Sequence, residues 1–243
     1  MARQWNSHPL LVTFCLLALW FGKKQWVIGE PVAPCFFIFG DSLVDGGNNN
    51  FLNTAAKVDY LPYGVDFPGG PTGRFSNGKT VADVITERLG LPNYIPAFAS
   101  AIPATGLLQG TLYNLGARKI ALAGISKIGC TPFAKTIAGR KGCVDSQNEA
   151  VVPFNKLLRD LAGRLNQDFP DAKFVYLDTM AATDPLPNTQ EPCCQVQTVG
   201  LCIPNGTFCD QRDTYVYWDA FHPTQAANYI VGPFLYQTLK QIL

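Results

Sequence analysis

An apolar run that ends in a turn and a serine constrains this sequence more than any other feature. The run Phe36–Phe39 leads directly into Gly40-Asp41-Ser42, and a segment rich in glycine and asparagine continues to Asn50. An apolar run closed by a turn signal is typical of a buried strand in a parallel sheet. Ser42 is then expected at the carboxyl edge of the sheet, where open α/β sheets bind their ligands. A serine there can be a nucleophile, and it can also be the N-cap of the next helix.

The rest of the chain alternates between strand-like and helix-like patterns. Apolar runs at 119–125 and 173–178 are typical of buried strands, and helical spacing of apolar residues occurs at 79–90, 107–116 and 148–169. A final helix is expected from about Pro223. Its inward-facing residues are expected to be Ala226, Ile230, Phe234, Leu235 and Leu239. With 243 residues, the pattern predicts one α/β domain with a parallel sheet.

The first 30 residues have the character of a signal peptide. A mildly basic start precedes twelve apolar or nearly apolar residues, Leu10–Phe21, which are too few to span a bilayer. A buried helix or a short anchor are the alternatives. We expect processing between Gly22 and Ala33, secretion of the chain, and no stable membrane anchor after the signal is removed.

Cysteine usage agrees with an oxidising compartment. Four cysteines fall within 193–209, and the chain has only two histidines and no Cys-x-x-Cys, which disfavours a zinc site. We expect disulfides between Cys130 and Cys143 and between the pairs Cys193/Cys194 and Cys202/Cys209, with Cys35 left over. In a secreted chain, Asn205-Gly206-Thr207 is a glycosylation sequon.

The charge pattern and one aromatic loop bear on partners. The formal net charge is +1, only 15% of residues are charged, and no basic block occurs, so nucleic acid and acidic membrane surfaces are not expected partners. Residues 60–78 are dense in glycine, proline and aromatic side chains, which predicts an ordered surface loop. Its aromatic residues and Arg74 either line a ligand cleft or hold the loop in place.

Three residues together suggest nucleophilic catalysis. A serine nucleophile needs a base, which is usually histidine, and removal of the signal leaves His222 as the single histidine. Asp219 precedes it by three residues, so one turn can bring the carboxylate to the imidazole. Competing motifs are missing from the sequence: Ser126 lacks the final glycine of Gly-x-Ser-x-Gly, and no phosphate-binding or dinucleotide-binding glycine motif occurs. Paired-carboxylate glycosidase chemistry has no motif by which to exclude it.

The sequence resembles the plant-type GDSL esterase/lipase family, which belongs to the SGNH hydrolases. The resemblance rests on Phe39–Asn50, Pro71–Gly78, Lys127–Pro132 and Trp218–Pro223, and it covers nearly all of 34–243. It implies a secreted ester hydrolase or acyltransferase with a flavodoxin-like, three-layer α/β/α fold and no metal or other cofactor. It also implies that Ser42 is the nucleophile, His222 the base and Asp219 the acid that orients it. The backbone N–H of Ser42 is then one oxyanion donor.

The sequence departs from this family in its middle. Family members carry a glycine block and a Gly-x-Asn-Asp block, which supply two further oxyanion donors, and neither block is present here. The seam is expected near Ser100-Ala101, and Asn114 is not expected to substitute. The missing region would contain two strands, one of them between the strands of Phe39 and Leu122. We therefore expect a sheet short of two strands and strongly reduced catalysis.

Two functions follow from these observations. The first is a secreted, monomeric serine ester hydrolase that acts on carboxylic acid or lipid esters, with activity impaired in this form. The second is a non-catalytic secreted glycoprotein that keeps the scaffold and binds a lipid or a partner through the aromatic loop. The presence of Ser42, Asp219 and His222 favours the first, and the missing oxyanion donors favour the second.

Overall fold

The chain divides into two units, Met1–Glu30 and Pro31–Leu243, and the description below concerns the second. The computed structural model describes residues 31–33, 36–97, 116–184, 186 and 191–243. Several predictions of the sequence therefore lie outside the described residues: the signal peptide, Cys35, the seam at Ser100-Ala101, Asn114 and most of the helix at 107–116.

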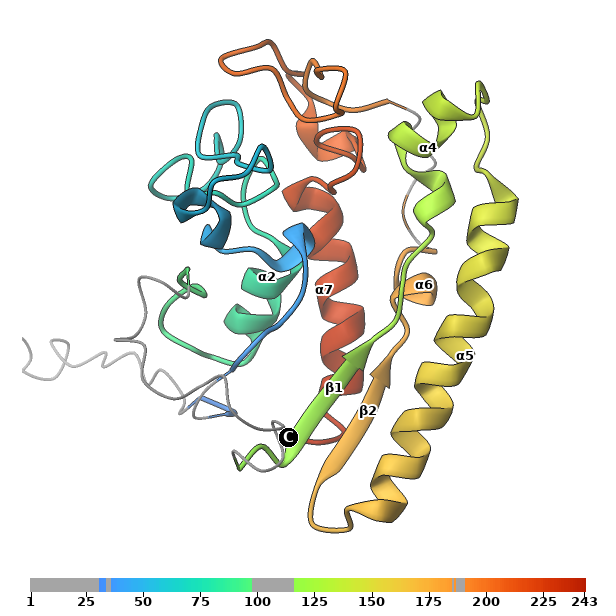
Figure 1. Ribbon diagram of the computed structural model, residues 1–243. Coiled ribbons are helices and arrows are strands. Elements are labelled where there is room, and N and C mark those ends of the chain that lie inside the picture. Colours follow the sequence, from blue (N-terminus) through green and yellow to red (C-terminus); the bar gives the residue numbers. More distant parts are fainter. Residues whose placement is uncertain (1–30, 34–35, 98–115, 185, 187–190) are drawn as a thin grey trace, which may run out of the picture. The chain divides into compact units, whose positions relative to one another are not determined.

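A parallel sheet lies at the centre of the unit (Figure 1). Within the described residues it has two strands, β1 (Lys119–Ala123) and β2 (Lys173–Leu177). The strands pair in register, from Lys119 opposite Lys173 to Ala123 opposite Leu177. Both strands match sequence predictions, and the α/β class is confirmed.

The two faces of the sheet are covered by different helices. Helix α5 (Asp145–Asp168) packs on one face, where Ala162 and Leu165 meet side chains of both strands. Helices α2 (Val81–Arg88) and α7 (Gln225–Leu239) belong to the core on the other face. Successive strand residues alternate between these clusters, as the two-residue period of a strand requires. Ile120, Leu122, Phe174 and Tyr176 point toward α5, and Ala121, Val175 and Leu177 toward α2 and α7.

Helix α2 shows why the predicted pattern at 79–90 forms a helix. Thr80 is the N-cap, and its side chain and that of Asp83 satisfy each other's backbone N–H groups in a capping box. The helix buries Ile85 against Leu235 of α7 in the same core cluster. Gly232 allows α7 to come this close, because a Cβ atom there would lie 2.5 Å from a methyl group of Val84.

The remaining elements are short. Helices α4 (Pro132–Ile137) and α6 (Thr179–Ala182) follow the carboxyl ends of β1 and β2. Four 3₁₀ turns complete the described elements, namely η1 (Ser42–Val44), η2 (Asn48–Phe51), η3 (Ile128–Cys130) and η4 (Arg212–Thr214).

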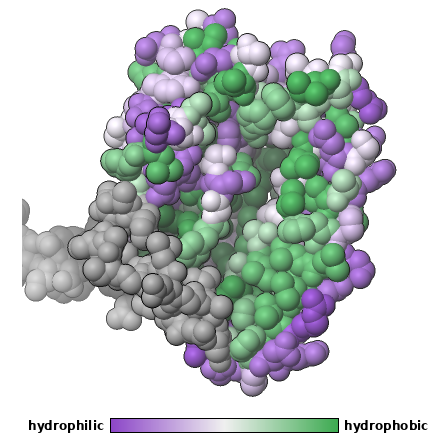
Figure 2. Space-filling view, viewed as in Figure 1, coloured by the Kyte–Doolittle hydropathy of each residue, from purple (hydrophilic) through white to green (hydrophobic). Residues whose placement is uncertain are grey.

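The strand expected at Phe36–Phe39 is not formed, and this prediction was wrong. The structure assigns no strand there, and Phe37 and Phe39 are 62% and 67% exposed. A strand needs a neighbour for its backbone groups as well as a place for its apolar side chains. Within the described residues, β1 pairs only with β2, so this run has no ladder to join. Figure 2 shows broad apolar surface over the area where Figure 1 draws the two strands and α5.

The buried faces of α5 and α7 were predicted only in part. On α7, Leu235 and Leu239 are buried as expected, but Ile230 and Phe234 are 43% and 44% exposed. On α5, Val151 is buried, whereas Val152 and Leu157, two of the apolar residues with helical spacing in 148–169, are exposed. The sequence pattern locates both helices correctly, but it does not predict how much of each apolar face packs against another element.

The disulfides agree with the predicted pairs. The structure contains Cys130–Cys143, Cys193–Cys209 and Cys194–Cys202. The last two disulfides fix the segment 192–210, which has no regular helix or strand of its own. Two backbone hydrogen bonds join this segment to residues 217–218: the N–H of Cys193 donates to the carbonyl of Tyr217 (3.0 Å), and the N–H of Cys194 donates to the carbonyl of Trp218 (2.9 Å). The loop at 60–78 is irregular as predicted, but it is largely buried rather than lying on the surface.

Candidate active site

Ser42 is the first residue of η1, directly after the extended run. The N-cap of this turn is Asp41, whose carboxylate accepts a hydrogen bond from the N–H of Leu43 (3.0 Å). Ser42 is therefore not the cap that the sequence left open as an alternative. Its hydroxyl oxygen lies 2.8 Å from Nε2 of His222, although the two residues are 180 positions apart.

His222 and Asp219 lie in one tight turn that leads into α7. Nδ1 of His222 is 2.7 Å from Oδ2 and 2.9 Å from Oδ1 of Asp219. The turn is closed by the N–H of Trp218, which donates to the carbonyl of His222 (2.7 Å). Because a carboxylate only accepts hydrogen bonds, Nδ1 carries the proton. In the neutral ring, Nε2 is then an acceptor that faces the Ser42 hydroxyl.

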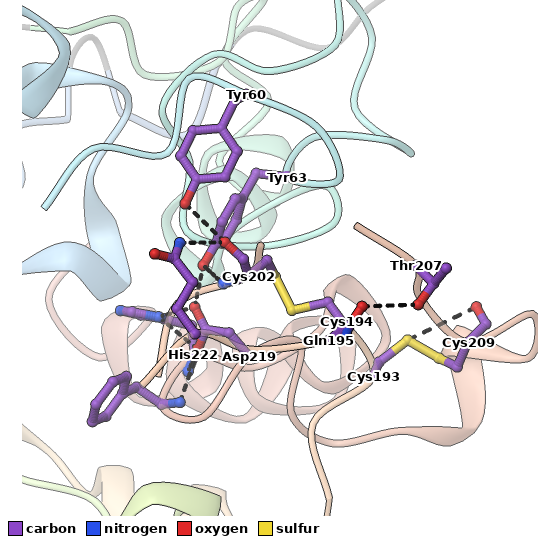
Figure 3. The surroundings of a disulfide bond; sticks show 12 residues. Tyr60, Tyr63, Cys193, Cys194, Gln195, Cys202, Thr207, Cys209, Asp219 and His222 are labelled. Atoms are coloured by element: carbon purple, nitrogen blue, oxygen red, sulfur yellow. Dashed lines mark hydrogen bonds and ion pairs between the residues drawn. A yellow bond between two sulfur atoms is a disulfide. The ribbon is translucent and has the colours of Figure 1, made fainter. Parts of the chain in front are cut away.

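The Asp219 carboxylate is fully buried and heavily hydrogen-bonded. Its Oδ1 atom accepts from the backbone N–H groups of Phe221 and His222, both at 2.8 Å. Its Oδ2 atom accepts from the hydroxyl of Tyr63 at 2.6 Å (Figure 3). These donors offset the cost of burying a charge, which is large for an unpaired carboxylate.

Aromatic rings hold the imidazole from two sides. The ring of Phe75 lies 4.7 Å from that of His222, and the ring of Phe221 lies 5.9 Å from it. Phe221 in turn packs on Phe133 at 4.5 Å. His222 is only 5% exposed, so its orientation is set by packing as well as by hydrogen bonds.

A buried ion pair supports the loop that follows Ser42. Arg74 binds both oxygens of Asp83 at 2.8 Å, and it also donates to the carbonyls of Gly46 (3.3 Å) and Ile95 (2.9 Å). Asp45 fixes the same loop by accepting from the N–H of Gly47 (2.8 Å). The sequence left two roles open for Arg74, lining a ligand cleft or holding the loop in place. The structure favours the second role.

The structure brings Ser42, Asp219 and His222 together as the sequence predicted, and it adds two contacts that the sequence did not identify. These are Tyr63 on Asp219 and Phe75 on His222. The signal available beforehand was the density of aromatic residues in 60–78, but no spacing rule connects that loop to a histidine about 150 positions later. Both residues belong to a buried cluster and are not free to contact a ligand.

The predicted glycosylation sequon lies on the surface of the protein. Asn205 and Thr207 of the sequon are exposed, and Asn205 adopts the left-handed backbone conformation with φ of 54°. Among the residues that the structure describes, no cluster of three or more His, Cys, Asp or Glu side chains is arranged to hold a metal ion. The described helices include none that is both long and apolar enough to span a membrane.

An α/β sheet with a serine, a histidine and an aspartate in hydrogen-bond contact is the arrangement of a serine hydrolase. Comparison with known proteins identifies the family. The model of the GDSL-like lipase/acylhydrolase family matches residues 36–114 and 97–233. Two similar proteins from Arabidopsis thaliana are GDSL esterase/lipase At2g19050, 32% identical over 90% of this chain and 91% of its own, and GDSL esterase/lipase At1g29660, 33% identical over 88% and 91%. The chain belongs to the GDSL-like lipase/acylhydrolase family, whose members are carboxylic ester hydrolases.

The alignments also bear on the length of the chain. The alignment with GDSL esterase/lipase At2g19050 is 320 positions long, whereas this chain has 243 residues. At least 77 positions of the alignment are therefore gaps in this chain. The two matches to the family model overlap at residues 97–114, the stretch in which the sequence predicted a seam.

We expect Arg74→Ala to destabilise the protein by about 3–5 kcal/mol, because it leaves the buried Asp83 carboxylate without its cation. Arg118→Ala is the matched control, since the Arg118–Asp171 pair is exposed on both sides and is expected to contribute less than about 1 kcal/mol. Urea unfolding of the two variants measures the difference. Equal losses of stability in both variants would contradict the supporting role of Arg74.

Proposed function

We propose that this chain is a secreted serine ester hydrolase that acts on carboxylic acid or lipid esters, with Ser42 as nucleophile, His222 as base and Asp219 as the acid that orients the base. The observation that supports these roles best is the continuous chain of contacts, with 2.8 Å from Ser42 Oγ to His222 Nε2 and 2.7 Å from His222 Nδ1 to Asp219 Oδ2. Family membership supports the reaction type.

The proposed reaction has two halves. His222 takes the proton of the Ser42 hydroxyl as the oxygen attacks the ester carbonyl, and it then donates that proton to the departing alcohol. Water attacks the resulting acyl-enzyme in the same way and releases the acid. Asp219 stabilises the imidazolium that forms in each half, and it remains ionised throughout.

We further propose that the reaction is slow in this form of the chain. The Ser42 N–H has no acceptor within the described residues, so it is available to bind the oxyanion. The other two donors that the family resemblance implies belong to blocks that the sequence lacks near Ser100-Ala101. The alignment of 320 residues with a 243-residue chain supports this internal truncation. Each missing donor is expected to cost roughly 10²–10³ in rate.

The second candidate, a non-catalytic module that binds a lipid or partner through its aromatic loop, has less support. Tyr63 and Phe75, the two residues of that loop that contact Asp219 and His222, are 0% and 3% exposed and pack in a core cluster. A ligand cannot reach them without unfolding the loop. The exposed apolar surface beside the sheet is the remaining observation in favour of binding.

Labelling with a fluorophosphonate probe tests the proposed nucleophile. We expect the folded, secreted wild-type chain to be labelled on Ser42 and the Ser42→Ala variant to remain unlabelled. Ser126→Ala is the matched control, because Ser126 follows β1 in a sequence that only resembles a hydrolase elbow, and it should label as the wild type does. A wild-type chain with a cooperative unfolding transition and no label would refute the catalytic role.

The expected localisation is extracellular, with the chain as a monomer and without a metal or other cofactor. Three disulfides and the exposed sequon at Asn205 support secretion.

Expression through a plant secretory pathway tests the sequon by mass. Glycosylation requires a hydroxyl at position 207. We therefore expect a glycan mass on the wild type and on Thr207→Ser, and none on Thr207→Ala. An unmodified wild-type chain recovered from the medium would contradict glycosylation, and absence from the medium would contradict secretion.

A further inference from the structure

Tyr63 is a buried side chain that the mechanism above does not use, although it contacts the site directly. Its hydroxyl lies 2.6 Å from Oδ2 of Asp219 and 3.0 Å from the N–H of Cys202 (Figure 3). We propose that Tyr63 is a positioning residue, whose hydroxyl holds Oδ2 of Asp219 where it accepts the hydrogen bond from the Nδ1–H group of His222. This inference rests on the function proposed for Ser42 and deepens it.

The two oxygens of Asp219 are held in different ways. Oδ1 lies 2.9 Å from Nδ1 of His222 and is fixed by two backbone N–H groups of its own turn, which any residue other than proline at positions 221 and 222 would provide. Oδ2 has Tyr63 as its donor besides the histidine, and Tyr63 comes from a loop 156 positions away. The distant loop therefore decides how the carboxylate presents Oδ2 to His222.

The direction of the hydrogen bonds is unambiguous. The N–H of Cys202 can only donate, so it uses a lone pair of the Tyr63 oxygen, and the Tyr63 proton points to Asp219. Burial, followed by the charge of Asp219, raises the pKa of the Tyr63 hydroxyl far above its ordinary value. Tyr63 therefore keeps its proton at neutral pH and donates it to Asp219.

The disulfide-linked segment 192–210 fixes Tyr63 in turn. Cys202 is bonded to Cys194, and its carbonyl accepts from the hydroxyl of Tyr60 (3.0 Å) and the side chain of Gln197 (2.9 Å). The rings of Tyr60 and Tyr63 meet edge to face at 5.5 Å. The disulfide-linked segment therefore positions Tyr63, and Tyr63 positions Asp219. The segment thus has a role at the site although none of Ser42, Asp219 and His222 belongs to it.

Tyr63→Phe tests the proposal, with Tyr60→Phe as the matched control. Each variant removes one hydroxyl that binds the backbone of Cys202, but only Tyr63→Phe removes a donor from Asp219. Two measurements are compared with the wild type: the rate of fluorophosphonate labelling, and the far-downfield proton resonance of the His222 Nδ1–H group. Thermal unfolding confirms that the variants are folded.

We expect Tyr63→Phe to slow labelling about ten- to one-hundred-fold, the effect of losing a hydrogen bond to a charged group, and to shift the Nδ1 proton resonance. Tyr60→Phe should label within about twofold of the wild type, because its triad contacts are unchanged. An Nδ1 resonance at the wild-type position in Tyr63→Phe would overturn the proposal. If the wild type is not labelled at all, the proposed function fails, and the resonance alone still decides the role of Tyr63.

Discussion

The carboxylate of Asp219 is buried without access to solvent and accepts hydrogen bonds from four groups of the protein. A buried charge of this kind is tolerated only when its hydrogen bonds are complete, because removing one partner leaves an uncompensated charge. Those partners join three parts of the sequence: the turn before α7, the aromatic loop at 60–78, and, through Tyr63, the disulfide-linked segment. Burial of one acid therefore requires these segments to fold together. Ser42 and His222 are aligned as a consequence.

The surroundings of His222 are well packed, whereas apolar residues beside the sheet are exposed. The imidazole of His222 packs against the rings of Phe75 and Phe221 and binds the buried Asp219, and the Arg74–Asp83 pair secures the loop after Ser42. Around the sheet, by contrast, the run at Phe36–Phe39 joins neither of the two described strands, and apolar residues of α5 and α7 are exposed. The contacts among Ser42, Asp219 and His222 come from the η1 turn and the turn before α7, so they do not depend on a full set of strands. This separation explains how a chain shorter than its relatives keeps the contact between Ser42 and His222.

Sequence reasoning succeeded where one local rule was sufficient. The strands at 119–123 and 173–177, the helices within 79–90 and 148–169, the disulfide between Cys130 and Cys143 and the contact between Asp219 and His222 each follow from residues close in sequence, and the structure contains these features. It failed where the outcome depends on a partner from elsewhere. The run at Phe36–Phe39 has the composition of a strand but pairs with no strand among the described residues, and Phe234 has helical spacing but is 44% exposed. Tyr63 was missed for the same reason, since its partner is 156 positions away.

In the mechanism that we propose, Ser42 and His222 are in place as nucleophile and base, while the stabilisation of the oxyanion is incomplete. The most direct measurement is the rate of ester hydrolysis by the chain, compared with a chimera that receives the corresponding middle segment of GDSL esterase/lipase At2g19050 at Ser100-Ala101. Both rates should be abolished by Ser42→Ala, and the chimera is expected to be faster by about 10⁴ or more, the combined effect of two restored donors. Equal rates for a folded chimera and the original chain would contradict the claim.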